Sequence, residues 1–214
     1  EHRTNLCLCR QVETEESRRP AGEAVSLVAF DTETYLITPG NLAPPLVCGS
    51  YATSDGEAEI LDKECTRAVF WSLLQTHDVM LVGANLAYDM TVMAVNAARR
   101  DLDWLPAIFA KYERGEVFDV SIAQMLDAVA KGTLGKDETG REIRYSLNEC
   151  VRIVLGRMNA KENDEWRLQY GELDAIPMTQ WPAVARQYPI DDAKNTLEVA
   201  QKQLSGGHHN MHDH

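Results

Sequence analysis

The chain has 214 residues, of which 44% are hydrophobic and 25% are charged, a composition typical of a folded globular protein. Its 21 Lys and Arg residues face 33 Asp and Glu residues, and the formal net charge of -12 argues against non-specific binding of duplex nucleic acid through many phosphates. No stretch reaches the roughly 18 apolar residues that cross a bilayer, and the N-terminal residues lack the apolar run of a signal peptide. We therefore expect a soluble, cytoplasmic protein without a membrane partner. One main domain is expected at residues 25–204, between an N-terminal extension at 1–24 and a tail at 205–214.

Short apolar runs separated by Pro- and Gly-containing turns predict the first three strands, at 24–30, 46–51 and 57–61. The next elements in chain order are a helix at 65–76, a strand at 79–83 and a helix at 88–100. From Trp104 the pattern is mainly helical, with helices at 105–114, 120–131, 146–155 and from Thr179 to about 204. Ser146 and Thr179 are the predicted N-caps of the last two helices. This order predicts an α/β domain with a mixed central sheet flanked by helices.

The first strand ends in a motif with two acids, Asp31-Thr32-Glu33-Thr34. Side chains alternate along a strand, so Asp31 and Glu33 point to the same side, with their backbones about 7 Å apart. Two carboxylates held this close favour a cation between them, and hard oxygen ligands favour Mg²⁺ or Mn²⁺ over zinc. An ordinary polar turn or a helix cap is the alternative interpretation.

A second motif, Asn85-Leu86-Ala87-Tyr88-Asp89, begins a helix directly after the strand at 79–83. Residues four apart share a helix face, so Asn85 and Asp89 can address one site. The alternative is capping, with Asn85 as the N-cap and Asp89 as a solvated charge in the first turn.

A third motif, Tyr188-Pro189-Ile190-Asp191-Asp192, lies in the last helical region. Successive helical residues are turned by about 100°, so Asp192 shares the side of Tyr188, and Asp191 faces away from it. Because the residue before a proline is driven out of the α region, we expect this helix to begin or kink here, which would move the Tyr188 hydroxyl.

The three motifs, in this order, resemble those of the DEDD family of 3′-to-5′ exonucleases, in the subclass whose third motif carries tyrosine. The resemblance spans residues 25–203 and is strongest to proofreading domains of phage-type family A DNA polymerases, to which Phe118-Asp119 and Ser146-Leu147-Asn148 are also similar. It implies a ribonuclease H-like fold, which is an α/β fold. It also implies hydrolysis of single-stranded or frayed DNA 3′ ends to nucleoside monophosphates, and a location in the host cytoplasm if the protein is phage-encoded.

By this resemblance, four carboxylates hold two divalent metal ions, Mg²⁺ or Mn²⁺, and Tyr188 helps to orient the attacking water. The four are Asp31, Glu33, Asp89 and Asp192. Two such ions activate water and neutralise the leaving 3′ oxygen, so no nucleophilic side chain is needed. The resemblance places Asp119 outside this quartet, as a helix cap or a partner of the site residues.

The resemblance also implies contacts with the terminal nucleotide. Thr32, Thr34 and Leu36 would hold it, with Leu36 wedged against the base, and Asn85 and Tyr88 would contact sugar and phosphate. Core packing is the alternative for Leu36 and Tyr88. The tail resembles a polymerase junction at residues 210–213, so a fused or associated polymerase region is a possible partner.

Residues 131–161 carry seven Lys and Arg against four Asp and Glu, a local charge of +3 that leaves -15 for the remainder. We hypothesise that this segment, with Arg141 and Arg144, lies beside the path of the strand. A solvated loop or hairpin at 132–144 without a partner is the alternative.

Other functions stay open at this point. An RNase D-like exoribonuclease would keep the chemistry and change the substrate, and a non-catalytic module would bind strands only. A zinc site at Cys7, Cys9 and the histidines of the tail (His208, His209, His212 and His214) is a remote third alternative, since reduced thiols are expected for the five cysteines.

Overall fold

The computed structural model describes residues 25–136, 139–158 and 166–206. The predicted N-terminal extension, the Cys7–Cys9 pair and the histidines of the tail lie outside these ranges, so the domain boundaries stay predictions. Cys48, Cys65 and Cys150, which lie within them, are thiols and not disulfides, as expected. No helix within the described ranges has both the length and the apolar character needed to cross a membrane.

A mixed five-stranded sheet forms the centre of the fold, with the strand order β3-β2-β1-β4-β5. The strands are β1 (Ser26–Thr34), β2 (Leu46–Thr53), β3 (Ala58–Asp62), β4 (Val79–Gly83) and β5 (Val117–Asp119). The central strand, β1, is antiparallel to β2 and parallel to β4, and β4 is parallel to β5. The predicted mixed sheet is therefore confirmed.

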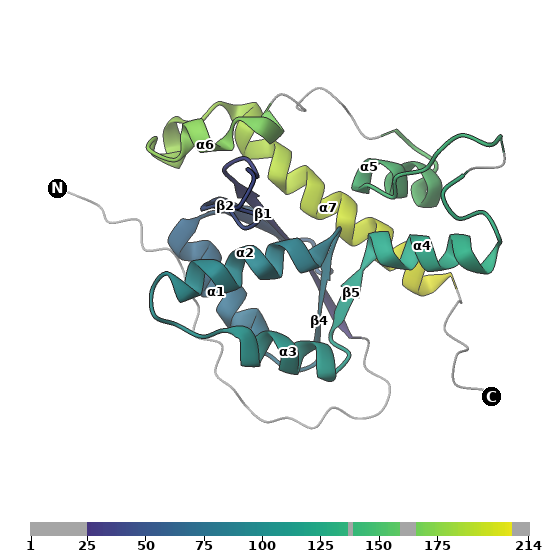
Figure 1. Cartoon of the computed structure of the whole chain (residues 1–214), viewed down its shortest axis with the longest axis horizontal. Helices are drawn as coiled ribbons and strands as arrows, with labels where there is room; N and C mark the ends of the chain where they lie inside the picture. The colour runs from purple at the N-terminus through teal and green to yellow at the C-terminus, as the bar shows by residue number, and fades with distance from the viewer. Residues whose placement is uncertain (1–24, 137–138, 159–165, 207–214) are drawn as a thin grey trace.

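Helices cover both faces of this sheet (Figure 1). The helices are α1 (Lys63–Gln75), α2 (Leu86–Ala98), α3 (Leu105–Glu113), α4 (Val120–Ala130), α5 (Leu147–Cys150), α6 (Tyr170–Leu173) and α7 (Ala183–Ser205). Phe30 and Leu81 pack with residues of α1, α2 and α3 in one core cluster. Their neighbours Ala29 and Val82 pack with α4 and α7 in another. The alternation of side chains along β1 and β4 thus divides the core into two layers.

Two strands differ from the sequence-based prediction. β1 does not end at Asp31 but runs to Thr34, because β2 continues to pair beside it, with Asp31 opposite Ser50 and Glu33 opposite Cys48. The first acidic motif therefore lies inside the sheet. β5 was not predicted, because three residues are too few to show strand periodicity, and β4 supplies their pairing.

The end of the chain also differs in detail. Ser146 caps α5 as expected, accepting a hydrogen bond from the backbone N–H of Glu149. The helix then continues as a π-helix, η1 (Val151–Leu155). Thr179 is not the cap of the last helix, since it lies in a separate 3₁₀ turn, η4 (Met178–Gln180). Pro182 keeps the residue before it extended, so α7 begins only at Ala183. A further 3₁₀ turn, η3 (Trp166–Leu168), precedes α6.

Candidate active site

A cleft with a volume of about 800 Å³ opens where β1 and β4 end. It is lined from β1, the start of α2, the start of α4, the segment that leads into α5, and α7. Every residue that the sequence predicted as catalytic, metal-binding or substrate-binding lines it: Asp31, Thr32, Glu33, Thr34, Leu36, Asn85, Tyr88, Asp89, Tyr188 and Asp192. Segments up to 161 residues apart in the chain thus meet at one surface.

Asp31 lies where the acidic side chains of the cleft converge. Burial raises the pKa of its carboxyl well above the ordinary value, and the charges of Asp89, Glu33 and Asp192 raise it further. The four predicted metal ligands are therefore close enough to repel one another. The ladder between β1 and β2 has a register shift just after Glu33, and such irregularities re-aim side chains beside active sites.

Asp89 is buried in the first turn of α2 and is held by Thr32. The backbone N–H of Thr32 donates to Oδ1 of Asp89 at 3.0 Å, and the Thr32 hydroxyl donates to the same atom at 2.6 Å. Burial raises the pKa of Asp89 to about 7, whereas the two hydrogen bonds from Thr32 act in the opposite direction by stabilising the carboxylate. Asp89 is thus not the solvated charge of the capping interpretation.

Asn85 precedes α2 in the left-handed conformation, with φ of 64°, and its side chain makes no capping hydrogen bond. Asp119, at the end of β5, supplies the acceptor instead. Its Oδ2 accepts from the N–H of Leu86 at 2.8 Å, and its Oδ1 accepts from the N–H groups of Ser121 and Ile122 at the start of α4. The predicted capping role of Asp119 is confirmed, and the Asn85 amide lines the cleft.

A close approach between β4 and α2 fixes the position of the second motif. A Cβ atom at Gly83 would lie 2.7 Å from Cδ1 of Leu86. Any larger residue at 83 would therefore push the start of α2, and with it Asp89, away from the sheet.

We expected the last helix to begin or kink at Pro189. It does not begin there, since α7 starts six residues earlier and remains helical through Pro189. Proline has no N–H to donate to the carbonyl of Ala185, four residues earlier. The buried hydroxyl of Tyr170 donates to that carbonyl at 2.7 Å in its place. The Pro189 carbonyl also accepts from the hydroxyl of Ser50 on β2, at 2.8 Å.

Tyr188 therefore projects from a continuous helix into the cleft. Burial raises the pKa of its hydroxyl far above the ordinary value, and the charges of Asp192 and Glu33 and a hydrogen bond with Asp192 raise it further. The hydroxyl stays protonated at neutral pH and can act as a hydrogen-bond donor. Asp191 accepts from Gln187 on the helix surface and does not line the cleft, as the helical spacing predicted.

The predicted substrate contacts separate into two environments. Leu36 is 54% exposed and lines the cleft, so core packing is the wrong alternative for it. Tyr88 packs partly against the core, and its hydroxyl lies 2.8 Å from the hydroxyl of Thr34. Tyr88 thus packs against the core and also lines the cleft, and its contact with sugar and phosphate stays a prediction.

The cleft also contains residues that the three motifs did not indicate. Among them are exposed apolar side chains, Ile37, Ile122, Met125 and Leu168, and one cation, Arg144. Helical periodicity identifies the exposed face of α4, but it gives no sign that Ile122 and Met125 face a site.

Ion pairs neutralise much of the basic segment at 131–161. Lys131 pairs with Asp127, and Arg157 pairs with Glu198. Arg141 and Arg152 both pair with Glu149. The antiparallel bridge between Lys136 and Glu142 favours the hairpin over the loop as the description of residues 132–144. The hypothesis of a strand path beside this segment thus rests on Arg144, and it stays a prediction.

Within the described residues, no group of three or more His, Cys, Asp or Glu side chains is arranged so that it could hold a metal ion as it stands. The acidic residues share the cleft without forming a closed ligand shell. Their chemistry nevertheless suits a hard divalent cation, because all four donors are carboxylates whose repulsion a cation would relieve.

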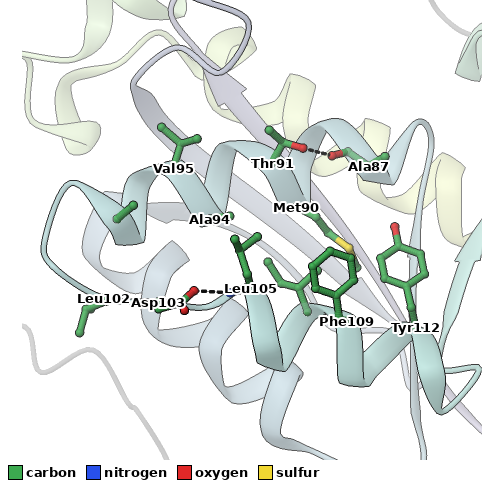
Figure 2. A pocket seen from close by; sticks show the side chains of 12 residues that line it. Ala87, Met90, Thr91, Ala94, Val95, Leu102, Asp103, Leu105, Phe109 and Tyr112 are labelled. Atoms are coloured by element: carbon green, nitrogen blue, oxygen red, sulfur yellow. Dashed lines mark hydrogen bonds between the residues drawn. The ribbon is translucent and has the colours of Figure 1, made fainter.

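A second hollow of about 560 Å³ lies between α2 and α3 and is lined mainly by apolar side chains (Figure 2). Two of its polar side chains already have partners, since the Thr91 hydroxyl donates to the Ala87 carbonyl and Asp103 accepts from the N–H of Leu105. None of the predicted site residues lines it, and it offers no convergent polar groups for chemistry.

No protein-family model matches the sequence, and no curated protein matches it. Solved structures do resemble the fold. RNase D of Trypanosoma brucei has a TM-score of 0.57 and 13% identity, over 83% of this chain and 57% of its own. NrnC of Brucella melitensis with bound Mg²⁺ has a TM-score of 0.52 and 17% identity, over 84% of this chain and 70% of its own.

The family B DNA polymerase of the archaeon Pyrobaculum calidifontis has a TM-score of 0.52 and 20% identity, over 89% of this chain and 25% of its own. The chain thus spans little more than half of the RNase D chain and a quarter of the polymerase. At these identities the likeness concerns the fold, which is the α/β, ribonuclease H-like exonuclease fold expected from the sequence. The particular resemblance to phage-type family A polymerases stays a prediction.

Proposed function

We propose that the chain is a divalent-metal-dependent 3′-to-5′ exonuclease that removes nucleoside monophosphates from single-stranded or frayed 3′ ends. The observation that carries this proposal is the convergence of four carboxylates and Tyr188, from three distant segments, on one cleft. Capping or solvated turns would leave these acids apart. Here burial raises the pKa of Asp31, and the charges of the three other acids raise it further.

The metal ions would be held by Asp31, Glu33, Asp89 and Asp192. When bound, they supply an activated water and neutralise charge on the leaving 3′ oxygen. The carboxylate donor set fits Mg²⁺ or Mn²⁺, and bound Mg²⁺ in the structurally similar NrnC supports this choice. Because ionisation of Asp31 is unfavourable beside the other acids, we expect the four side chains to draw together around a cation.

The remaining residues of the cleft have roles that follow from their contacts. Thr32 fixes the carboxylate of Asp89 with two hydrogen bonds. Tyr188 keeps its proton and would orient the attacking water from beside Asp192. Leu36, exposed at the edge of the cleft, would lie against the terminal base, whose face carries no sequence information.

Two substrates are compatible with this site. We propose DNA, with the chain as the proofreading module of a DNA polymerase, and the fold likeness to a family B polymerase supports this choice. The likeness to RNase D favours RNA as the second candidate. A module that only binds strands would have no need for four converging carboxylates.

The test uses single-stranded DNA and RNA of one sequence, labelled at the 5′ end, with Mg²⁺ or Mn²⁺. The wild type should produce a ladder that shortens from the 3′ end, and both EDTA and Asp31→Asn should abolish it. Asp191→Asn is the matched control, because Asp191 lies on the same helix as Asp192 but outside the cleft. This variant should keep full activity.

Each other outcome corrects the proposal at a different point. A ladder that survives EDTA or Asp31→Asn would refute the metal mechanism. Faster degradation of RNA would replace DNA with the second candidate. Binding of both strands without cleavage would leave a strand-binding module.

A further inference from the structure

Among the described residues, Arg144 is the one basic side chain that lines the cleft. It is exposed, and it makes no ion pair with any residue of the described ranges. Its neighbours in the same segment differ, since Arg141 and Arg152 share the carboxylate of Glu149. The charge of Arg144 is therefore available to an anionic ligand.

The backbone on the C-terminal side of Arg144 is well anchored. Tyr145 is buried, with φ of 46°, and its hydroxyl accepts a hydrogen bond from the N–H of Gly135 at 2.9 Å. Ser146 then caps α5. Arg144 is thus presented to the cleft from a fixed position, which reduces the entropy lost when it binds.

An apolar surface from α4 lines the same cleft. The side chains of Ile122 and Met125 line the cleft, and they are 52% and 38% exposed. The start of α4 is fixed by Asp119, which accepts from the N–H of Ile122. Exposed aliphatic side chains beside a lone cation suit an unpaired nucleotide, which has an apolar base face and a charged phosphate.

The scissile phosphate must lie at the carboxylates. The four carboxylates reach the cleft from β1, α2 and α7, whereas Arg144 reaches it from the segment that leads into α5. A phosphate on Arg144 therefore belongs to another nucleotide of the same strand.

We propose that Arg144 binds an internal phosphate of the substrate strand, on the 5′ side of the scissile bond, while a base of that part of the strand lies on Ile122 and Met125. This inference rests on the proposed function and adds to it a strand-binding subsite. The site would then select a strand of several nucleotides over a single nucleotide, through binding and not through the chemical step. Arg144 is a positioning residue in this scheme.

The experiment compares two substrates of the full chain with Mn²⁺. One is a short thymidine oligonucleotide, and the other is the p-nitrophenyl ester of thymidine 5′-monophosphate, which has a single phosphate. Arg144→Gln should raise KM for the oligonucleotide about tenfold, with kcat changed by less than about twofold. KM for the ester should not change.

The salt dependence of binding distinguishes a phosphate contact from a purely structural role of Arg144, because a structural role would leave it unchanged. The logarithm of the affinity for a single strand falls linearly with the logarithm of the salt concentration, and each phosphate contact adds about 0.7 to the steepness of this line. Arg144→Gln should therefore make the line less steep by about 0.7. Arg144→Lys should recover most of the binding. Arg186→Gln is the matched control, an exposed arginine of α7 outside the cleft, and should leave both substrates unaffected.

The apolar part of the subsite is tested with Met125→Ala. This variant should raise KM about threefold for the oligonucleotide and should have no effect on a strand with abasic sugars at the upstream positions. An equal change for both substrates with Arg144→Gln, or no change for either, would overturn the inference. If the wild type cleaves neither substrate, the proposed function fails and not this subsite alone.

Discussion

The pairing of Tyr170 with the helix that contains Pro189 can be tested through stability. Pro189 lies inside α7, and the hydroxyl of Tyr170 donates at 2.7 Å to the Ala185 carbonyl that the proline leaves without its helical partner. Tyr170→Phe removes this donor and keeps the ring. Pro189→Ala restores the backbone N–H, which can then donate to the same carbonyl.

The expected magnitudes follow from burial. Tyr170 is completely buried, so Tyr170→Phe leaves the carbonyl without a partner and should cost about 2 kcal/mol. In the Pro189→Ala background the carbonyl has its helical donor, and the same change should cost about 0.5 kcal/mol. The coupling free energy is therefore about 1.5 kcal/mol. Pro189→Ala alone should stabilise by about 1 kcal/mol, because the roughly 3 kcal/mol penalty of a proline in a helix exceeds the loss of two buried methylene groups.

The assay is urea unfolding of the four proteins of this double-mutant cycle, followed by circular dichroism. Tyr51→Phe is the control, because this tyrosine is partly exposed and its hydroxyl makes only a 3.4 Å contact with Glu59. Its free energy of unfolding should change by less than about 0.5 kcal/mol. A coupling below about 0.3 kcal/mol in the cycle would refute the role given to Tyr170.

Three further changes test the site and its supports. Asp119→Asn replaces an acceptor of the Leu86 N–H with a donor. It should therefore lower the free energy of unfolding by about 2 kcal/mol in urea, and it should lower activity by moving α2. Unchanged stability would contradict the capping role of Asp119. Lys111→Met should cost about 3 kcal/mol, because buried Lys111 donates to two carbonyls and to Glu116. Burial alone would raise the pKa of Glu116, but hydrogen bonds from Lys111 and a nearby arginine lower it below its usual value. The stabilisation that ionised Glu116 gives to the fold is therefore present above about pH 4.5 and is lost as the pH falls below that. Lys111→Met should flatten this part of the curve of unfolding free energy against pH. Tyr188→Phe should lower kcat about tenfold with little change in unfolding, and full activity would remove its hydroxyl from the mechanism.

Much of the site could be predicted because its residues are tied to local patterns. Asp31 and Glu33 come at the end of an apolar run that is typical of a buried strand, and Asp192 follows Tyr188 at helical spacing. These periodicities fix which side chains share a face, and the resemblance to known motifs places the three segments together.

Other features depend on contacts between distant residues, which no local pattern encodes. Pro189 predicts a break in the helix, and only the fold brings the hydroxyl of Tyr170 to the carbonyl that it leaves open. Asn85 is a residue type that favours the N-cap position, yet Asp119 accepts the hydrogen bond from the start of α2, from its place at the end of β5. Similarly, the sequence gives Arg141 and Arg144 the same charge, and ion pairing with Glu149 is what distinguishes them.

The contacts of Asp119 also have a consequence for the proposed metal site. The N-termini of α2 and α4 meet there, and a helix N-terminus carries a partial positive charge that commonly binds phosphate. In this chain the protein's own carboxylate takes that place at both helices, so neither end is left as an anion site. Attraction of the scissile phosphate to the carboxylates would then come from the bound cations of the proposed function, because the phosphate assigned to Arg144 lies elsewhere on the strand. In the proposed function, the concentration of free divalent metal would therefore set how much of the population can cleave a bound strand.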